Sequence, residues 1–245
     1  MKRILAIDTS SDHCSIALSN QQGQIFASSI NSPRQHSQKL LPLIDELLGS
    51  QQMALADIDA IAYGRGPGSF TGIRICLGVV QGLAYSQDIP VVPVSTLRAM
   101  AQGALRQKLV GAQEAVLVAV DARMDEVYWA LYQCLPTAAS GSEHGLQLVQ
   151  LADEAVSPPA LVAEHNALRQ VQGKGLVCLG SGHHYAQISA IAAGQHVADF
   201  EPQAVDILQL AQLELEQGGA LAAEQAQPVY LRDSVAWKKR QRIRN

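Results

Sequence analysis

The chain has 245 residues, of which 48% are hydrophobic, and a formal net charge of −4. This length allows one large domain or two of ordinary size with a substantial core. The first apolar run ends at Asp8, too early for a signal peptide, and no run approaches the roughly 18 apolar residues of a membrane span. These features predict a cytoplasmic protein without membrane association.

The charges are unevenly distributed along the chain. Five of the 18 Lys and Arg residues lie between Lys238 and Arg244, so residues 1–237 hold 18 − 5 = 13 basic against 22 acidic residues. An acidic body disfavours binding of a long nucleic acid across it. The basic tail is either a solvated terminus or a contact for nucleic-acid phosphates.

The cysteines give no sign of a metal or redox site. They are far apart, none forms a Cys-x-x-Cys pair, and each lies in or beside an apolar run. This pattern predicts four buried, reduced thiols: Cys14, Cys76, Cys134 and Cys178.

The chain contains an internal duplication. Leu5–Leu18 aligns without gaps on Val118–Leu131, with Ala, Asp, Asp, Ala and Leu in register, and each copy is typical of a hairpin. Farther on, the strand-like segment Ile61–Gly66 is echoed by Val177–Gly182, and both end in Gly-x-Gly. A repeated supersecondary unit implies a repeated fold.

The predicted elements follow this duplication in chain order. After the first hairpin we expect a strand, helix, strand, helix, strand and helix over 24–30, 37–48, 58–63, 70–86, 90–94 and 96–106. After the second we expect a strand, helix, strand and helix over 145–151, 160–172, 175–179 and 185–193, and a last helix over 203–217.

This order resembles the duplicated, two-lobed α/β fold of the actin-like superfamily, which includes sugar kinases and heat-shock ATPases. We expect an N-terminal lobe over 1–106 and a C-terminal lobe over 107–245, with a last helix that can pack back on the first lobe and a basic tail.

A glycine-rich loop, Gly64–Arg74, follows a predicted strand and opens a helix, a setting in which backbone amides can bind an anion. The Walker pattern fails because isoleucine follows Gly72, and the dinucleotide fingerprint fails because it requires glycine at Thr71. Two interpretations remain. The loop is a tight turn with Ser69 or Thr71 capping the helix, or it contacts an anion or a partner.

Two aspartates end equivalent predicted strands beside the expected cleft, where actin-like ATPases keep carboxylates for a metal-bound nucleotide. These are Asp8 and Asp121. The first turn makes Asp8, Thr9 and Ser10 candidate nucleotide-binding residues, although it lacks the glycine that brings backbone close to a phosphate. The alternative is a structural carboxylate that accepts hydrogen bonds from turn amides.

No catalytic or metal-binding motif is present in the sequence. The seven histidines contain no pair four residues apart, and His183–His184 are adjacent, so their side chains point in different directions. No Gly-x-Ser-x-Gly elbow occurs either. We therefore expect no catalytic residue, no metal and no cofactor.

Two consecutive predicted helices are unusually apolar. Leucine and isoleucine side chains of the helix over 37–48 cover an arc of roughly 160°, wider than one core contact needs, and the helix after the glycine loop has Gly78 and Gly82 one turn apart. The chain's own sheet covers both helices, or they form a helical interface with a partner or a second copy. The predicted interface residues are Leu40, Leu41, Ile44, Leu47, Leu48, Ile75, Gly78, Val79 and Gly82.

Four segments resemble the landmarks of the TsaB (YeaZ) family, and together they span most of the chain. They are Leu5–Ser10, Gly64–Arg74, Pro93–Leu97 and Pro228–Arg232. The resemblance implies an actin-like protein of tRNA threonylcarbamoyladenosine modification, a bacterial system that transfers threonylcarbamoyl from its adenylate to an adenosine of tRNA.

The related catalytic protein, TsaD, carries a His-x-x-x-His metal motif after its fifth strand, whereas Thr96 and Met100 stand at those positions here. The resemblance therefore implies a non-catalytic subunit that binds TsaD through the two apolar helices, works with TsaE, reaches tRNA through the complex and can form a homodimer when alone. The alternative is an enzyme, either an actin-like phosphotransferase or a glycoprotease-type metallopeptidase.

Overall fold

The computed structural model describes residues 1–137 and 145–232. The first half contains β1 (Ile4–Asp8), β2 (His13–Ser19), β3 (Ile25–Asn31), α1 (His36–Ser50), β4 (Ala60–Gly64), α2 (Phe70–Gln87), β5 (Val91–Val94) and α3 (Thr96–Arg106). The second half contains β6 (Ala115–Arg123), β7 (Glu126–Pro136), β8 (Leu146–Ser157), α4 (Pro159–Ala163), α5 (Asn166–Val171), β9 (Gly173–Leu179), α6 (Ala186–Ser189), β10 (Ala193–Val197) and α7 (Ala204–Glu216). Short 3₁₀ turns η1 (Leu55–Asp57), η2 (Ser181–His184) and η3 (Ala223–Gln225) connect some of them.

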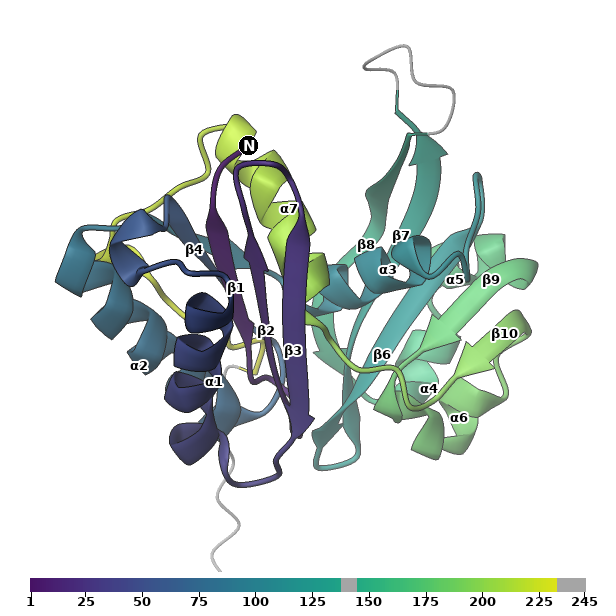
Figure 1. Ribbon diagram of the computed structural model, residues 1–245. Coiled ribbons are helices and arrows are strands. Elements are labelled where there is room, and N and C mark those ends of the chain that lie inside the picture. Colours follow the sequence, from purple (N-terminus) through teal and green to yellow (C-terminus); the bar gives the residue numbers. More distant parts are fainter. Residues whose placement is uncertain (138–144, 233–245) are drawn as a thin grey trace, which may run out of the picture.

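The two halves have the same topology. The strand orders are β3-β2-β1-β4-β5 and, read from the other edge, β8-β7-β6-β9-β10. In each sheet the first strand pairs antiparallel with the second and parallel with the fourth. The predicted duplication and the two-lobed, actin-like α/β fold are therefore confirmed (Figure 1).

The hairpin register differs by one residue from the ungapped alignment. Leu5 pairs with Leu18 in the first copy, but Leu131 pairs with Leu117 instead of Val118 in the second. The second turn is one residue shorter, because Asp8 pairs with Ser15 while Asp121 pairs with Val127.

Most predicted boundaries are confirmed, and the errors lie in the second half. The single helix predicted over 160–172 is wrong: it is broken into α4 and α5 at His165, whose backbone is extended. The helix predicted over 185–193 is also wrong, because α6 has four residues and is followed by β10. β10 is a mostly exposed edge strand, so it lacks the alternation of buried and exposed residues that identifies a strand.

The first sheet has a different kind of core on each face. Leu5 and Ile7 of β1 pack with the leucines of α1 and with α2, whereas Ile4 and Ala6 pack with α7. The alternation follows from the period of two in a strand. Small residues on the second face bring α7 close to β1, β2, β4 and β5.

Helices α3 and α7 form the layer that joins the two sheets (Figure 1). Ala99 of α3 packs with α7, while Leu97, Met100 and Ala104 pack on the second sheet. The far face of that sheet is covered by α4, α5 and α6. Although α7 comes after the second sheet in the chain, it packs on the first.

All four cysteines are free and buried, as predicted. Burial raises the pKa of the Cys14 and Cys134 thiols to about 11 and that of Cys178 to about 12. Within the part of the chain that the structure describes, no helix has the length and apolar character needed to cross a bilayer.

A buried ion pair connects α3 to α7. Asp206 of α7 is 1% exposed, and its carboxylate accepts hydrogen bonds from Arg106 at 2.7 and 3.0 Å. Burial raises the pKa of Asp206, and the Arg106 guanidinium opposes this effect. A second pair, Arg98–Glu214 at 2.6 Å, joins the same helices, but its side chains are 36% and 30% exposed.

These two pairs should differ in their contribution to stability. We expect Arg106→Gln to lower the free energy of unfolding by about 3 kcal/mol, since it leaves a buried carboxylate without its cation. Arg98→Gln should lower it by less than about 1 kcal/mol, because water screens the exposed pair. Urea unfolding of both variants measures the difference, and equal losses would contradict this explanation.

Candidate functional site

The turn after β1 is buried and makes its hydrogen bonds within the chain. Asp8 is 1% exposed, and its Oδ1 accepts from the backbone N–H of Ser10 at 3.0 Å and from the Ser10 hydroxyl at 2.8 Å. Thr9 donates its hydroxyl to the carbonyl of Gly72 at 2.8 Å. Asp8 Oδ2 has no partner among the described residues. The candidate nucleotide-binding residues therefore lie inside the protein.

The glycine loop lies directly on this turn. The Ser69 N–H donates to the Ser10 carbonyl at 2.7 Å. A Cβ on Gly68 would be 2.6 Å from that carbonyl oxygen, and one on Gly64 would be 1.9 Å from Asp8 Oδ2. Glycine is needed at these positions because the backbone approaches the turn more closely than a side chain permits.

The structure confirms that the glycine loop is a tight turn whose Ser69 caps the next helix. The Ser69 hydroxyl accepts from the Gly72 N–H at 3.3 Å and caps α2, whereas Thr71 is exposed. Contact of the loop with an anion or a partner stays a prediction.

The second copy repeats the bonding of the first. Asp121 Oδ1 accepts from the Arg123 N–H at 2.8 Å, two residues on, as Asp8 does from Ser10. It also accepts from the Tyr185 hydroxyl at 3.0 Å. Both aspartates thus act as structural carboxylates of a turn, and a nucleotide role for the first stays a prediction.

The positions compared with the TsaD metal motif are buried. Thr96 begins α3, and its N–H donates to the Gly66 carbonyl at 3.0 Å, while Met100 packs against the second sheet. Neither a threonine hydroxyl nor a thioether is a usual ligand for the borderline metals, such as Zn²⁺, that imidazole binds. Over residues 1–137 and 145–232, no group of three or more His, Cys, Asp or Glu could hold a metal ion.

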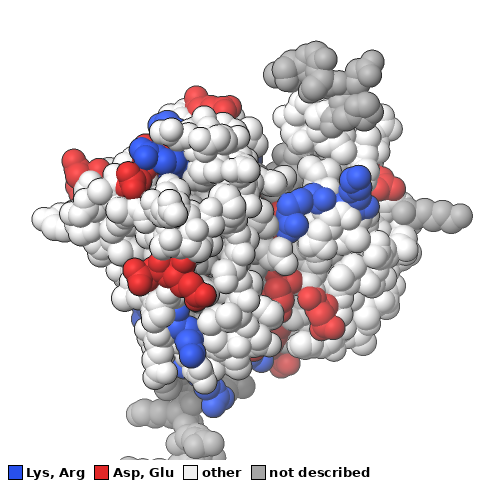
Figure 2. Space-filling view, viewed as in Figure 1, with Lys and Arg blue, Asp and Glu red and all other residues white. Residues whose placement is uncertain are grey.

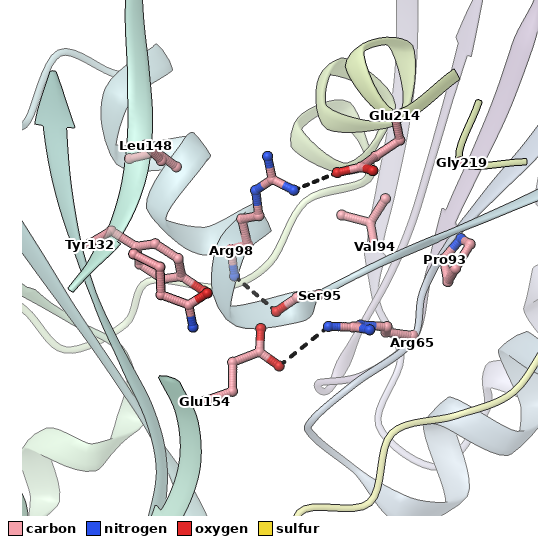
Figure 3. Close-up of a pocket in the computed structure, with 11 residues that line it drawn as sticks. Arg65, Pro93, Val94, Ser95, Arg98, Tyr132, Leu148, Glu154, Glu214 and Gly219 are labelled. Atoms are coloured by element: carbon pink, nitrogen blue, oxygen red, sulfur yellow. Dashed lines mark hydrogen bonds and ion pairs between the residues drawn. The ribbon is translucent and has the colours of Figure 1, made fainter. Parts of the chain in front are cut away.

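A pocket of about 370 Å³ lies between the lobes (Figure 3). Arg65 of the glycine loop pairs with Glu154 of β8 at 3.7 Å, and Arg98 pairs with Glu214. Burial and the nearby Glu154 raise the pKa of Tyr132, which also faces the pocket. Because its two arginines are matched by two glutamates, the pocket is a neutral polar site with no excess positive charge for a phosphate. Its other lining residues are Pro93, Val94, Ser95, Leu148, Gln150 and Gly219.

The C-terminal segment Gln227–Arg232 crosses from the first lobe to the second. The Val229 N–H donates to the Arg65 carbonyl at 2.8 Å. Arg232 Nε donates to Glu126 at 3.1 Å, and its Nη2 donates to the Ala122 carbonyl at 3.3 Å. This segment, which includes one of the four that resemble family landmarks, therefore connects the glycine loop to the turn between β6 and β7. The sequence alone did not indicate this role.

The structure narrows the predicted helical interface. Leu40, Ile44, Leu47 and Leu48 of α1 are buried, because the first sheet and α2 together cover the wide apolar arc. The prediction that these four side chains contact a partner came from the width of the apolar arc. It is not supported, because they are buried within this chain. Leu41 is 49% exposed on the outer side of α1.

Helix α2 does present an outward face. Gly78 and Gly82 are exposed, and a Cβ on either would meet nothing within 4 Å. Ile75 and Val79 are half-buried beside them, and Tyr85 is 80% exposed. This face, residues 75, 78, 79, 82 and 85, is called the α2 groove below. Its role in binding stays a prediction.

An aromatic cluster lies at the start of α2. The Arg74 guanidinium is 3.7 Å from the centroid of the Phe70 ring, and its Nε donates to the Tyr230 hydroxyl at 2.9 Å. Both aromatic rings are about half exposed. The cluster therefore continues the exposed surface of α2 onto the C-terminal segment.

The face shown in Figure 2 has small, separate basic and acidic patches and no extended basic surface. This agrees with the acidic composition of the body. The basic tail, Lys238–Arg244, lies outside the described residues.

The buried Asp8 should make stability depend on pH. Burial raises its pKa from 3.8 to about 6, against the opposing effect of the Ser10 hydrogen bonds. The folded chain therefore keeps a proton that the unfolded chain releases, and the free energy of unfolding falls as pH rises from about 4 to 6. Asp8→Asn keeps the Oδ1 acceptor and removes this effect. We expect the free energy of unfolding of the variant minus that of the wild type to increase by up to about 3 kcal/mol from pH 4 to pH 7. Urea unfolding at several pH values measures this difference. A difference that stays constant with pH would contradict the prediction.

Close packing at the glycine loop can be tested with two matched substitutions. A Cβ on Gly72 would be 1.9 Å from the Thr9 carbonyl oxygen, so Gly72→Ala should lower the free energy of unfolding by about 3 kcal/mol or more. Gly78→Ala, on the open side of the same helix, should raise it by about 0.5–1 kcal/mol. Thermal and urea unfolding would show opposite signs; two changes of the same sign would refute the packing argument.

Comparisons with known proteins agree with this structure. The model of the TsaD family, described as tRNA N6-adenosine threonylcarbamoyltransferase, matches residues 24–239. The tRNA threonylcarbamoyladenosine biosynthesis protein TsaB of Escherichia coli is 44% identical over 97% of both chains, and that of Haemophilus influenzae is 37% identical over 96% of both. The solved structure of YeaZ from Pseudomonas aeruginosa is 40% identical, covers 94% of this chain and 100% of its own, and superposes with a TM-score of 0.80. The chain therefore belongs to the TsaB family, within the wider family that the TsaD model defines.

Proposed function

We propose that the chain is a non-catalytic subunit in tRNA threonylcarbamoyladenosine biosynthesis. In this role it binds TsaD, works with TsaE and supports transfer of threonylcarbamoyl from threonylcarbamoyl-adenylate to adenosine in tRNA. Relatives identical at 44% and 37% of positions are named as TsaB proteins of this biosynthesis, which supports the assignment to the process.

The geometry of the cleft between the lobes supports the proposal that the subunit is non-catalytic. A phosphotransferase or a metallopeptidase needs groups that contact the substrate or a metal. Here Asp8, Thr9 and Ser10 are covered by the glycine loop, and Thr96 and Met100 are packed in the interior. The arginines of the pocket are paired with carboxylates. No specific observation favours the enzymatic alternative.

The exposed α2 groove supports the proposal that the chain binds TsaD. It is the observation on which this proposal mainly rests. Gly78 and Gly82 leave space for a second helix to approach closely, as small residues spaced four apart do at packed helices. Half-buried Ile75 and Val79 supply apolar edges, and Tyr85 and the Arg74 cluster supply residue types enriched at interfaces. The partner is then a helix of TsaD, or of a second copy when the chain is alone.

The test places a charge in the α2 groove without disturbing the fold. In cells depleted of the chromosomal copy, we expect Gly82→Glu to reduce both co-purification of TsaD and threonylcarbamoyladenosine in bulk tRNA at least tenfold. The substitution should be tolerated in the free chain, since nothing lies within 4 Å of the new Cβ. Leu41→Glu is a second variant, at the exposed leucine of α1, the helix that packs beside α2.

Leu161→Glu is the control, because Leu161 is an exposed leucine on α4 of the second lobe, 60% exposed. It should retain both readouts. If Gly82→Glu and Leu41→Glu keep TsaD bound, the docking surface is wrong. If depletion itself leaves threonylcarbamoyladenosine unchanged, the role in the process is wrong.

A further inference from the structure

Two histidines far apart in the sequence meet at the carboxyl end of the second sheet. His183 lies in η2, directly after β9, and His196 lies on β10. His183 Nε2 is 2.7 Å from His196 Nδ1, and the rings are perpendicular with centroids 4.9 Å apart. Thirteen positions separate the two residues in the sequence, so the adjacency of His183 and His184 gave no sign of this contact.

The other nitrogen of each ring determines what the facing nitrogens can do. His183 Nδ1 is 2.8 Å from the Gly180 carbonyl, and His196 Nε2 is 3.1 Å from the Ile191 carbonyl. A carbonyl oxygen only accepts, so these two nitrogens carry the ring protons. In two neutral rings the facing nitrogens therefore each present a lone pair. Lone pairs at this distance repel unless a cation lies between them.

We propose that His183 and His196 form a binding site for a divalent transition-metal ion, of which Zn²⁺, Cu²⁺ and Ni²⁺ are the members that imidazole nitrogen favours. Metal-bound histidines usually donate their other ring N–H to a carbonyl or carboxylate, which fixes the tautomer, and both rings do so here. The described residues supply no group of three donors, so water completes the coordination.

The two facing nitrogens must move apart slightly to hold an ion. An ion about 2.0–2.1 Å from each nitrogen holds them roughly 2.9 Å apart at the right angle of a square-planar site and roughly 3.3 Å apart at a tetrahedral angle, against the observed 2.7 Å. His196 is exposed and His183 is partly exposed, so the rings can adjust and water can reach the ion.

The backbone holds the site in place. Gly180 has φ +99°, and a Cβ there would be 2.6 Å from the Ala119 carbonyl oxygen, so η2 is packed closely on β6. The Gly180 N–H donates to the Val197 carbonyl at 3.0 Å, beside His196. The site lies where the parallel strands β9 and β10 end, the edge at which open α/β sheets bind ligands. It is independent of the α2 groove and of the proposed function.

The test uses the full-length chain without an affinity tag, stripped of metal by a chelator that is then removed. Calorimetric titration with Zn²⁺ should give one ion per chain, and His183→Gln and His196→Gln should each weaken binding at least tenfold. The matched control is His184→Gln, the adjacent and 55% exposed histidine, which should bind as wild type does. With Cu²⁺, electron paramagnetic resonance should show two coupled imidazole nitrogens in the wild type and one in either variant of the pair.

The circular dichroism spectrum of each variant confirms that it is folded. Absence of saturable binding to the wild type would overturn the proposal, and would mean that a proton alone bridges the rings. Equal affinity in the wild type and both variants, or an equal loss in His184→Gln, would also overturn the assignment to this pair.

Discussion

The close contact between the glycine loop and the turn after β1 is the constraint on which the first lobe depends. Gly72 lies against the Thr9 carbonyl with no space for a Cβ, and the Ser69 N–H binds the Ser10 carbonyl. Since α2 starts at this contact, the contact fixes how the helix lies on the sheet. It thereby determines that Cys76 and Val80 face the core while Gly78 and Gly82 face outward.

The same contact accounts for the closed character of the cleft. In a two-lobed fold the turns after β1 and β6 are where a ligand could meet backbone amides, yet here both aspartates bind their own turns. Arg65, paired with Glu154, joins the loop to the second lobe. With α3 and α7 packed between the sheets, the chain is suited to act through a surface, in agreement with the proposed role of the α2 groove.

The two copies show how one duplicated framework serves different purposes. Both have a Gly-x-Gly turn after the fourth strand of the unit, at Gly64 and Gly180. In the first copy the turn continues into a loop that covers the chain's own strand end and caps a long helix. In the second it continues into η2, which directs His183 toward His196 on the edge strand. The difference arises because α6 is short and leaves that edge open.

The sequence by itself determined the order of the elements in the first half, the duplication and the extent of α3, and it limited the cap of α2 to Ser69 or Thr71, because these features depend on local periodicity and on short-range hydrogen bonds. It did not determine what covers α1, since an apolar arc measures how much surface must be buried and not whether a sheet, a neighbouring helix or a partner buries it. Ile44 was therefore predicted at an interface and lies in the core. It also could not place Arg106 beside Asp206, or His183 beside His196. Such pairs are separated by many residues and meet only when whole layers pack, and that packing depends on the tertiary structure.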